Sequence, residues 1–205
     1  YTMSNTTSSI LLMGDITPPP YEVIALSFYN HGTETWMDRL EMGAPVRCVK
    51  GENTIPEVFV CGPSTVNYNG HDYSTFTNWD GQCWFQEDLK TELYTNGDTI
   101  AGNLSEAEWL ATEEGAQAVY NDDETHLETY GRLYNHNAIQ DERGVCPTDW
   151  RVSTSADWDD VFAIFGGTTN VGFTLKSPDG WNGGGSQILF HGLPGGLRSG
   201  EASVG

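Results

Sequence analysis

Acidic side chains are the first candidates for chemistry in this sequence, because 29 Asp and Glu stand against nine Lys and Arg. Two clusters are dense enough to be considered as calcium sites, since Ca²⁺ prefers oxygen ligands. They are Asp122–Glu124 and the group formed by Asp157, Asp159 and Asp160. Neither has the alternating ligand spacing of an EF-hand loop. We interpret both as solvated acidic surface, with Ca²⁺ as the alternative, and expect no other cofactor.

No catalytic motif accompanies these acids. The sequence has no H-E-x-x-H, G-x-S-x-G or P-loop pattern, and its five His lack metal-ligand spacing. Gly183–Gly185 resembles a phosphate-binding loop only superficially, because no strand and Lys frame it; a loop packed against Trp181 is the favoured interpretation. Carboxylate pairs for glycoside hydrolysis are placed by the fold, so 29 acids give no specific signal. We therefore expect no enzymatic activity and name no catalytic or metal-binding residue.

The cysteine pattern indicates where the protein works. The four Cys are widely spaced and form no C-x-x-C pair, which argues against a zinc ribbon or a thioredoxin-type site. They are Cys48, Cys61, Cys83 and Cys146. An even number of Cys in an acidic chain rich in Gly and Asn indicates two disulfides, and therefore an extracellular or cell-surface location. The sequons at Asn5 and Asn103 permit glycosylation there.

The charge excludes two classes of partner. A net charge of −20 is incompatible with binding nucleic acid or anionic membrane surfaces, since both require clustered positive charge. No run approaches the roughly 18 apolar residues of a membrane span, so no membrane insertion is expected. The length of 205 residues predicts one large domain, or one domain with arms. Tyr1–Ser4 has neither an initiator Met nor a signal peptide, which we interpret as a processed or excised segment.

Short strands are predicted at several places along the chain. Val23–Tyr29 and Val46–Val49 are apolar runs of strand length, and the alternation around Asn69-Gly70 predicts a β-hairpin with a tight turn. Helical signals are fewer: a capping box at Ser105 opens a short helix to about Glu113, and a weaker helix is expected over 129–138.

The clearest helix follows a second capping box, Thr154-Ser-Ala-Asp157. Four large apolar residues then recur at helical spacing, which predicts one buried face. They are Trp158, Val161, Phe162 and Phe165, and Gly166-Gly167 ends the pattern. Few helices, several short strands and long loops together predict an α+β fold.

From Cys61 onward, short motifs follow one another in a specific order. They are Cys61-Gly62, Tyr68-Asn-Gly-His-Asp-Tyr73, Asp80-Gly-Gln-Cys-Trp-Phe85, Tyr94-Thr-Asn-Gly-Asp98, Tyr130-Gly-Arg-Leu-Tyr-Asn135, Gly144-Val-Cys-Pro-Thr-Asp-Trp150, Trp181-Asn-Gly-Gly184 and Leu193-Pro-Gly-Gly196. This series resembles the Fibrobacter succinogenes major paralogous domain, which is found in secreted surface proteins. The resemblance implies a C-type-lectin-like fold, related to that of formylglycine-generating enzymes, with two or three helices, long loops and two disulfides.

The resemblance also bears on individual residues. It implies that Cys61 pairs with Cys83 and Cys48 with Cys146. The related enzymes use a reactive Cys pair in an open cleft, whereas all four Cys here match structural positions, so that activity is not implied. The sequence departs from the family at Asp149, where a Gly is usual.

The order of the motifs differs from that of the family. Val46-Arg-Cys-Val49 corresponds to the end of the family domain, and Pro194-Gly-Gly-Leu-Arg198 to a position about two-thirds along it. Reading residue 205 into residue 1 restores the family order. A complete domain is therefore residues 61–205 followed by 1–50, with 51–60 as the linker.

This circularly permuted order motivates our functional expectation. A chain that holds the end of one domain and the beginning of the next is typical of a head-to-tail polymer. We therefore expect a non-enzymatic structural subunit of an extracellular filament, sheath or stalk. Its partners would be copies of itself. The alternative is a secreted lectin-like module for carbohydrate binding or adhesion, with Trp79, Trp181 and Asn182 as its candidate glycan contacts. An enzyme is the weakest interpretation.

Two arrangements of residues 1–50 satisfy the implied bond between Cys48 and Cys146. In a closed permutant, these residues return to the body of their own chain. In a swapped polymer, they complete residues 61–205 of a neighbouring chain by strand addition. We expect the swap, with Cys48 bonded to Cys146 of the adjacent chain, because it gives the unusual order of the motifs a purpose.

Overall fold

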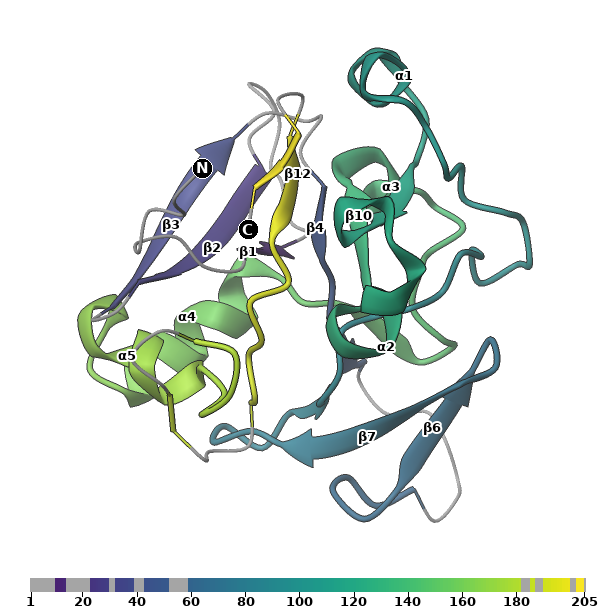
Figure 1. The fold of residues 1–205 in the computed structure, drawn as a ribbon. Coiled ribbons are helices and arrows are strands. Elements are labelled where there is room, and N and C mark those ends of the chain that lie inside the picture. The colour runs from purple at the N-terminus through teal and green to yellow at the C-terminus, as the bar shows by residue number, and fades with distance from the viewer. Residues whose placement is uncertain are drawn as a thin grey trace.

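The computed structural model of the protein describes residues 10–13, 23–29, 32–38, 43–51, 59–181, 185–186, 190–199 and 202–204. The described residues form an α+β fold of short antiparallel strands and five α-helices (Figure 1). The helices are α1 (Glu106–Ala111), α2 (Leu127–Tyr130), α3 (His136–Gln140), α4 (Ser155–Ile164) and α5 (Thr168–Leu175). None of the described helices is long and apolar enough to cross a membrane.

The first five-stranded sheet joins segments that are far apart in the chain. Its strand order is β13-β12-β4-β10-β9, with every pair antiparallel. The bounds are β4 (Gly43–Pro45), β9 (Gln117–Val119), β10 (Arg132–Asn135), β12 (Leu197–Ser199) and β13 (Ala202–Val204). Strand β4 therefore lies in the middle, between two strands that come much later in the sequence.

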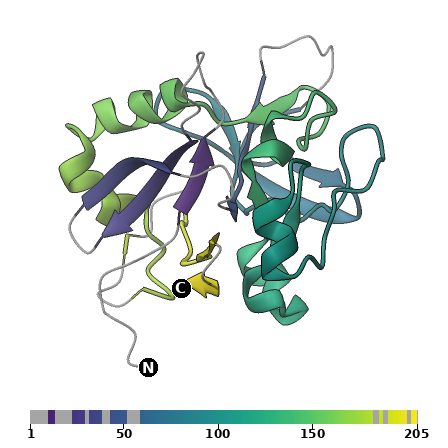
Figure 2. The same ribbon diagram turned by 90° about the horizontal axis from the view of Figure 1, so that it is seen from above.

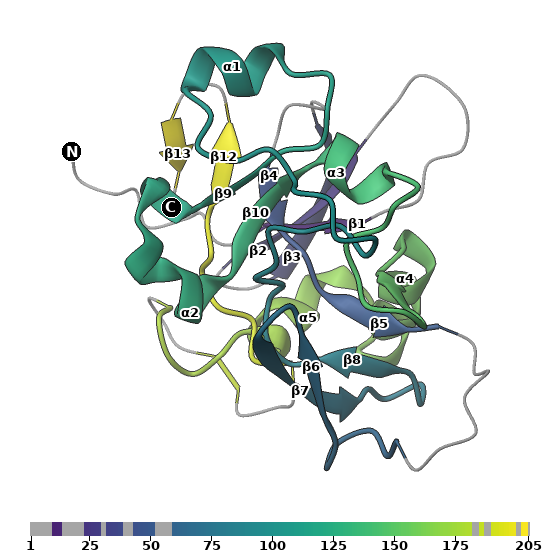
Figure 3. The same ribbon diagram turned by 90° about the vertical axis from the view of Figure 1, so that its right-hand side faces the viewer.

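The second five-stranded sheet has the order β11-β5-β8-β7-β6 (Figure 3). The bounds are β5 (Cys48–Lys50), β6 (Thr65–Tyr68), β7 (His71–Thr77), β8 (Cys83–Phe85) and β11 (Trp150–Val152). Adjacent residues in a strand point to opposite faces. Cys48 and Phe85 accordingly enter one apolar core, whereas their neighbours Val49 and Trp84 enter a second core on the other face.

A third sheet has the order β1-β2-β3, with bounds β1 (Ile10–Met13), β2 (Val23–Tyr29) and β3 (Gly32–Asp38). Helix α5 packs against β2 and β3, and β1 lies beside β4 (Figure 2). The apolar run Val23–Tyr29 is thus a strand, as its composition predicts.

The hairpin and both capping boxes are confirmed. Asn69 and Gly70 have φ of 50° and 83°, and they join β6 to β7 with the left-handed residues that a tight hairpin turn requires. Ser105 and Glu108 cap α1 reciprocally, and Thr154 and Asp157 do the same for α4. Helix α1 ends at Ala111, two residues before the predicted end.

Helix α4 buries most of the predicted face. Trp158, Val161 and Phe162 are buried in the second core, with exposed fractions of 1%, 3% and 5%. Phe165 is only partly buried and forms the C-cap; its ring lies edge-on to Trp79, with 4.6 Å between the centroids.

The helix predicted over 129–138 is wrong. Helix α2 ends at Gly131, which has a φ of 67°, and the next four residues form β10. Strand β10 pairs with both β4 and β9, so pairing with distant segments determines its conformation. Asn135 then caps α3 by accepting a hydrogen bond from the Ala138 N–H at 2.9 Å.

Both disulfides form within the chain: Cys61–Cys83 and Cys48–Cys146, with Cα separations of 5.8 and 5.9 Å. The expected exchange between neighbouring chains is therefore wrong for residues 43–50. Strands β4 and β5 pair with strands of their own chain, and the Gly51 N–H donates to the Asp149 carbonyl at 2.6 Å. The linker predicted at 51–60 falls largely on 52–58, which lie outside the described residues.

Candidate functional site

A cleft of about 520 Å³ opens beside the Cys48–Cys146 disulfide. Its lining consists of Thr95 together with residues 139–140, 143–152 and 154. These residues come from the end of α3, the loop that follows it, β11 and the cap of α4. One continuous stretch of chain therefore provides most of the cleft.

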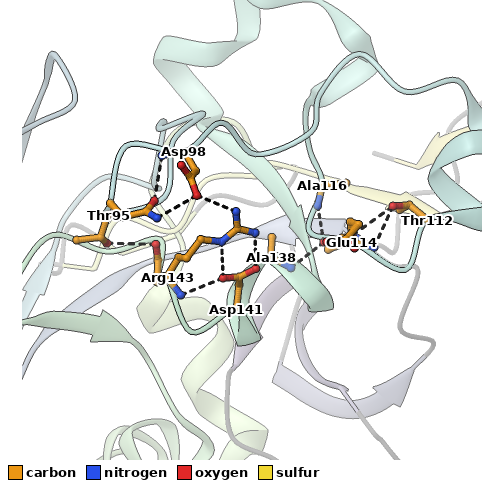
Figure 4. A network of polar contacts seen from close by, with 11 residues as sticks. Thr95, Asp98, Thr112, Glu114, Ala116, Ala138, Asp141 and Arg143 are labelled. Atoms are coloured by element: carbon orange, nitrogen blue, oxygen red, sulfur yellow. Dashed lines mark hydrogen bonds and ion pairs between the residues drawn. The ribbon is translucent and has the colours of Figure 1, made fainter.

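Arg143 lines the cleft and is bonded to two carboxylates (Figure 4). Its guanidinium donates twice to the carboxylate of Asp141, at 2.8 and 2.7 Å, and once to Asp98 at 3.1 Å. It also lies over the ring of Tyr94, 3.9 Å from the centroid. The hydrogen bonds from Arg143 lower the pKa of Asp141 to about 2, so the pair stays charged over the physiological range.

Thr95 fixes the loop that carries Asp98 to the body of the cleft. Its backbone N–H donates to the Gly144 carbonyl at 2.9 Å, and its hydroxyl donates to the Cys146 carbonyl at 2.6 Å. Hydrogen bonds from Asn96 and Arg143 lower the pKa of Asp98. The cleft therefore holds its polar groups in place through the backbone next to the disulfide.

A second ion pair lies at the other end of the lining segment. Arg151 donates twice to Asp157, at 2.6 and 2.8 Å, and the Thr154 N–H donates to the same carboxylate at 2.6 Å. Burial raises the pKa of Asp157, but the hydrogen bonds from Arg151 and Thr154 outweigh it and the pKa is lowered overall. Asp157 thus completes the cap of α4 and also holds Arg151, which lines the cleft.

Trp150 provides an aromatic surface in the cleft, and Asp149 has an unusual backbone conformation there. The Trp150 ring is partly buried, with its centroid 4.4 Å from that of Phe85 and 5.8 Å from that of Phe59. Asp149 has a φ of 67°, a conformation that glycine adopts most easily. This explains why a Gly is usual at this position in the family that the sequence resembles. Strain of this kind in a cleft is characteristic of binding sites.

Members of both predicted acidic clusters form ion pairs, as Asp157 does with Arg151. Asp122 pairs with Arg198, and Glu124 with Arg132 at 3.3 Å. Within the described part of the chain, no group of three or more His, Cys, Asp or Glu is arranged to hold a metal ion.

The predicted glycan contacts lie outside this cleft. Trp79 packs against Phe165, and Trp181 donates its indole N–H to the Gly192 carbonyl at 2.7 Å; both rings pack on the second core. They act as loop anchors in this structure. Asn182 lies outside the described residues.

Of the predicted glycosylation positions, Asn103 is exposed, with a φ of 55°, two residues before the capping Ser105. Its side chain is therefore accessible for modification. Asn5 lies outside the described residues.

Sequence reasoning missed Arg143 and Trp150 as cleft residues, and Asp141 as the partner of Arg143. Two signals were present: the acid and the base stand two positions apart, and Asp149 replaces a Gly. Neither signal shows that Asp98, which is 45 residues from Arg143, joins them.

Comparison with known protein families identifies the family of this chain. The Fibrobacter succinogenes major domain matches residues 78–203, a segment that contains the whole lining of the cleft. No curated protein and no solved structure matches the chain. Because the matched segment is well over half of the 205 residues, the chain belongs to the Fibrobacter succinogenes major domain family.

Proposed function

We propose that this chain is a non-enzymatic, extracellular, C-type-lectin-like module that binds a neutral glycan in the cleft beside Cys146. The observation that carries the proposal is the pairing of both arginines of the cleft with carboxylates, next to a partly buried Trp ring. The two disulfides support an oxidising, extracellular location.

The electrostatics of the cleft favour a neutral ligand. Arg143 is balanced by Asp141 and Asp98, and Arg151 by Asp157. No net positive charge is therefore left to attract an anionic group. A chain of net charge −20 also repels anions at long range.

The hydrogen-bonding groups suit a polyhydroxylated ligand. A guanidinium has five N–H donors in a fixed plane, and a carboxylate has about four acceptor sites. Three donors of Arg143 already contact Asp141 and Asp98, which holds the group rigid before a ligand arrives. Hydroxyl groups can both donate to such carboxylates and accept from such guanidinium groups. The apolar face of a sugar ring would pack on Trp150.

The test is binding of neutral and uronic-acid oligosaccharides on an array, followed by calorimetry of any hit with calcium or with a chelator. Thr148 is exposed in the cleft, so Thr148→Trp should fill the cleft and abolish binding. Thr99→Trp is the matched control, because Thr99 is also exposed and is not part of the lining. Absence of binding to every neutral glycan, or binding that survives Thr148→Trp but not Thr99→Trp, would refute the proposal.

A structural subunit of an extracellular filament, sheath or stalk is the second candidate. The order of the sequence motifs motivates it, because a head-to-tail polymer joins the end of one domain to the beginning of the next. Since β4 and β5 pair within the chain, exchange of these strands does not supply the joint. Long regular filaments in electron micrographs of the purified material would support this function, and only dispersed particles at high concentration would contradict it.

A further inference from the structure

Strand β6 ends the second sheet, and its only strand partner among the described residues is β7 (Figure 3). The pairing runs from Tyr68 opposite His71 to Thr65 opposite Ser74. Exposure alternates along the strand: Thr65 and Asn67 are exposed, whereas Val66 and Tyr68 are half-buried against the first core. The outer side of this strand is an open sheet edge.

The register shows which backbone groups face that edge. In a hairpin with a two-residue turn, the residues that flank the turn form a hydrogen-bonded pair, and such pairs alternate with pairs that share no hydrogen bond. The backbone groups of Tyr68 and Val66 therefore point toward β7, and those of Thr65 and Asn67 point outward. The hydrogen bond of Ser74, the partner of Thr65, supports this assignment, because the Ser74 N–H points away from β6 and donates to Glu87 at 2.8 Å.

The edge is short, which limits pairing between molecules, but it has no other feature that prevents it. Exposed edge strands are usually protected by charged side chains, by Pro or by a bulge. The four residues of β6, Thr-Val-Asn-Tyr, include no charged residue and no Pro, and their register with β7 has no bulge. In a chain of net charge −20, an uncharged strand reduces the repulsion that a second copy meets on approach, and the nearest carboxylate, Asp72 on β7, is hydrogen-bonded to Asn67.

We propose that β6 pairs antiparallel with β6 of a second copy of this chain, about a two-fold axis at Val66. In this register, Thr65 bonds to Asn67 of the copy, and Asn67 bonds to Thr65 of the copy. The alternatives are worse. If the two-fold axis lay at Thr65, Pro63, which has no N–H, would lie opposite Asn67 of the copy. If it lay at Asn67, the turn residue Asn69, with its φ of 50°, would have to continue the ladder of hydrogen bonds.

The size and charge of this contact set its properties. A four-residue edge is smaller than the interface of a stable dimer, so association depends on concentration. Both copies are strongly acidic, so salt should strengthen the association by screening their repulsion. This self-association is a property separate from glycan binding, and Thr148→Trp should leave it unchanged.

The register is tested by cross-linking. At the two-fold axis, the two Val66 residues form a pair without hydrogen bonds, with Cα atoms about 4.5 Å apart, a separation at which a disulfide can form. Val66→Cys should therefore link two copies under mild oxidation. Asn67→Cys is the matched control: its counterpart lies two positions along the ladder, beyond the roughly 7 Å limit. Equal linking of both variants, or none at Val66→Cys, would overturn the register.

The edge itself is tested by sedimentation velocity over a concentration series at low and high salt. Asn67→Pro removes the outward N–H, and edge strands tolerate Pro where the N–H faces solvent, so the hairpin should persist while the dimer is lost. Asn67→Ala also loses the side-chain bond to Asp72 but keeps the N–H, and it should still dimerise. Thr65→Asp should weaken the dimer without removing any backbone group, because it adds a negative charge to the edge of an already acidic chain. A wild-type chain that stays monomeric throughout, or a dimer that survives Asn67→Pro, would overturn the proposal.

Discussion

Replacing Phe162 by Ala should destabilise the protein strongly, because Phe162 lies at the centre of the second core. Its side chain is 5% exposed and packs with Trp158, whose ring centroid is 6.2 Å away, among Trp84, Val171 and Phe190. These neighbours come from a strand, two helices and a loop, so no single element can shift to fill the space. The change therefore removes buried apolar surface and leaves a cavity.

Phe→Ala substitutions at such sites cost about 3–5 kcal/mol of unfolding free energy. Single domains have about 5–15 kcal/mol in total, so the loss is a large fraction of it. For a chain of this length, the melting temperature should fall by roughly 6–20 °C.

The assay is urea denaturation of the oxidised protein, followed by tryptophan fluorescence and by far-ultraviolet circular dichroism. Coincident transitions would justify a two-state free energy. Ile164→Ala is the matched control, because Ile164 lies two residues away on α4 and is 46% exposed. Its cost should stay within about 1 kcal/mol. Similar losses for both variants would refute the assignment of the buried face of α4.

Three further predictions concern the disulfide, pH and a close contact. Replacing both Cys48 and Cys146 by Ala should cost about 4–5 kcal/mol in urea denaturation on the loop-entropy model, because the bond closes a separation of 98 residues; a loss below that of a typical surface variant would contradict it. Burial lowers the folded-state pKa of His136 below 6.5, so the unfolded state binds more protons and the free energy of unfolding should fall as the pH drops below 6.5. His136→Phe should flatten this dependence of stability on pH, and an unchanged dependence would contradict the assignment. Gly115→Ala should cost about 1–3 kcal/mol in thermal denaturation, because the added Cβ would lie 2.8 Å from the Ala138 Cα; an unchanged melting temperature would contradict this close approach.

The elements predicted correctly are those whose signals are local. The turn at Asn69-Gly70 and the capping box at Thr154 each lie within four residues, and the local chemistry agrees with the final structure. The helix predicted over 129–138 fails for the opposite reason. Its residues can form a helix, but β10 completes a sheet whose other strands lie far away in the sequence.

The cleft could not be predicted from the sequence because its parts are distant and polar. Asp98 and Arg143 are 45 residues apart, and 29 acids offer many equivalent partners for nine bases. The two aromatic residues predicted as glycan contacts show the same limit of sequence patterns. Trp79 and Trp181 stand in loops rich in Asn and Gly, yet their rings pack inward on the second core. The two local signals were the spacing of Asp141 and Arg143 and the departure at Asp149 from the family that the sequence resembles.

The position of residues 43–50 has a consequence for how the chain folds. This short segment gives an interior strand to each five-stranded sheet, and the side chain of Arg47 reaches Asp88 and the carbonyl of Phe190, 143 residues away. During synthesis Arg47 therefore emerges roughly 7–30 s before Phe190, at 5–20 residues per second. Contacts of such high sequence separation form slowly. The apolar surfaces that these strands complete stay open over this interval, and exposed surface of this kind is what aggregates or is bound by chaperones.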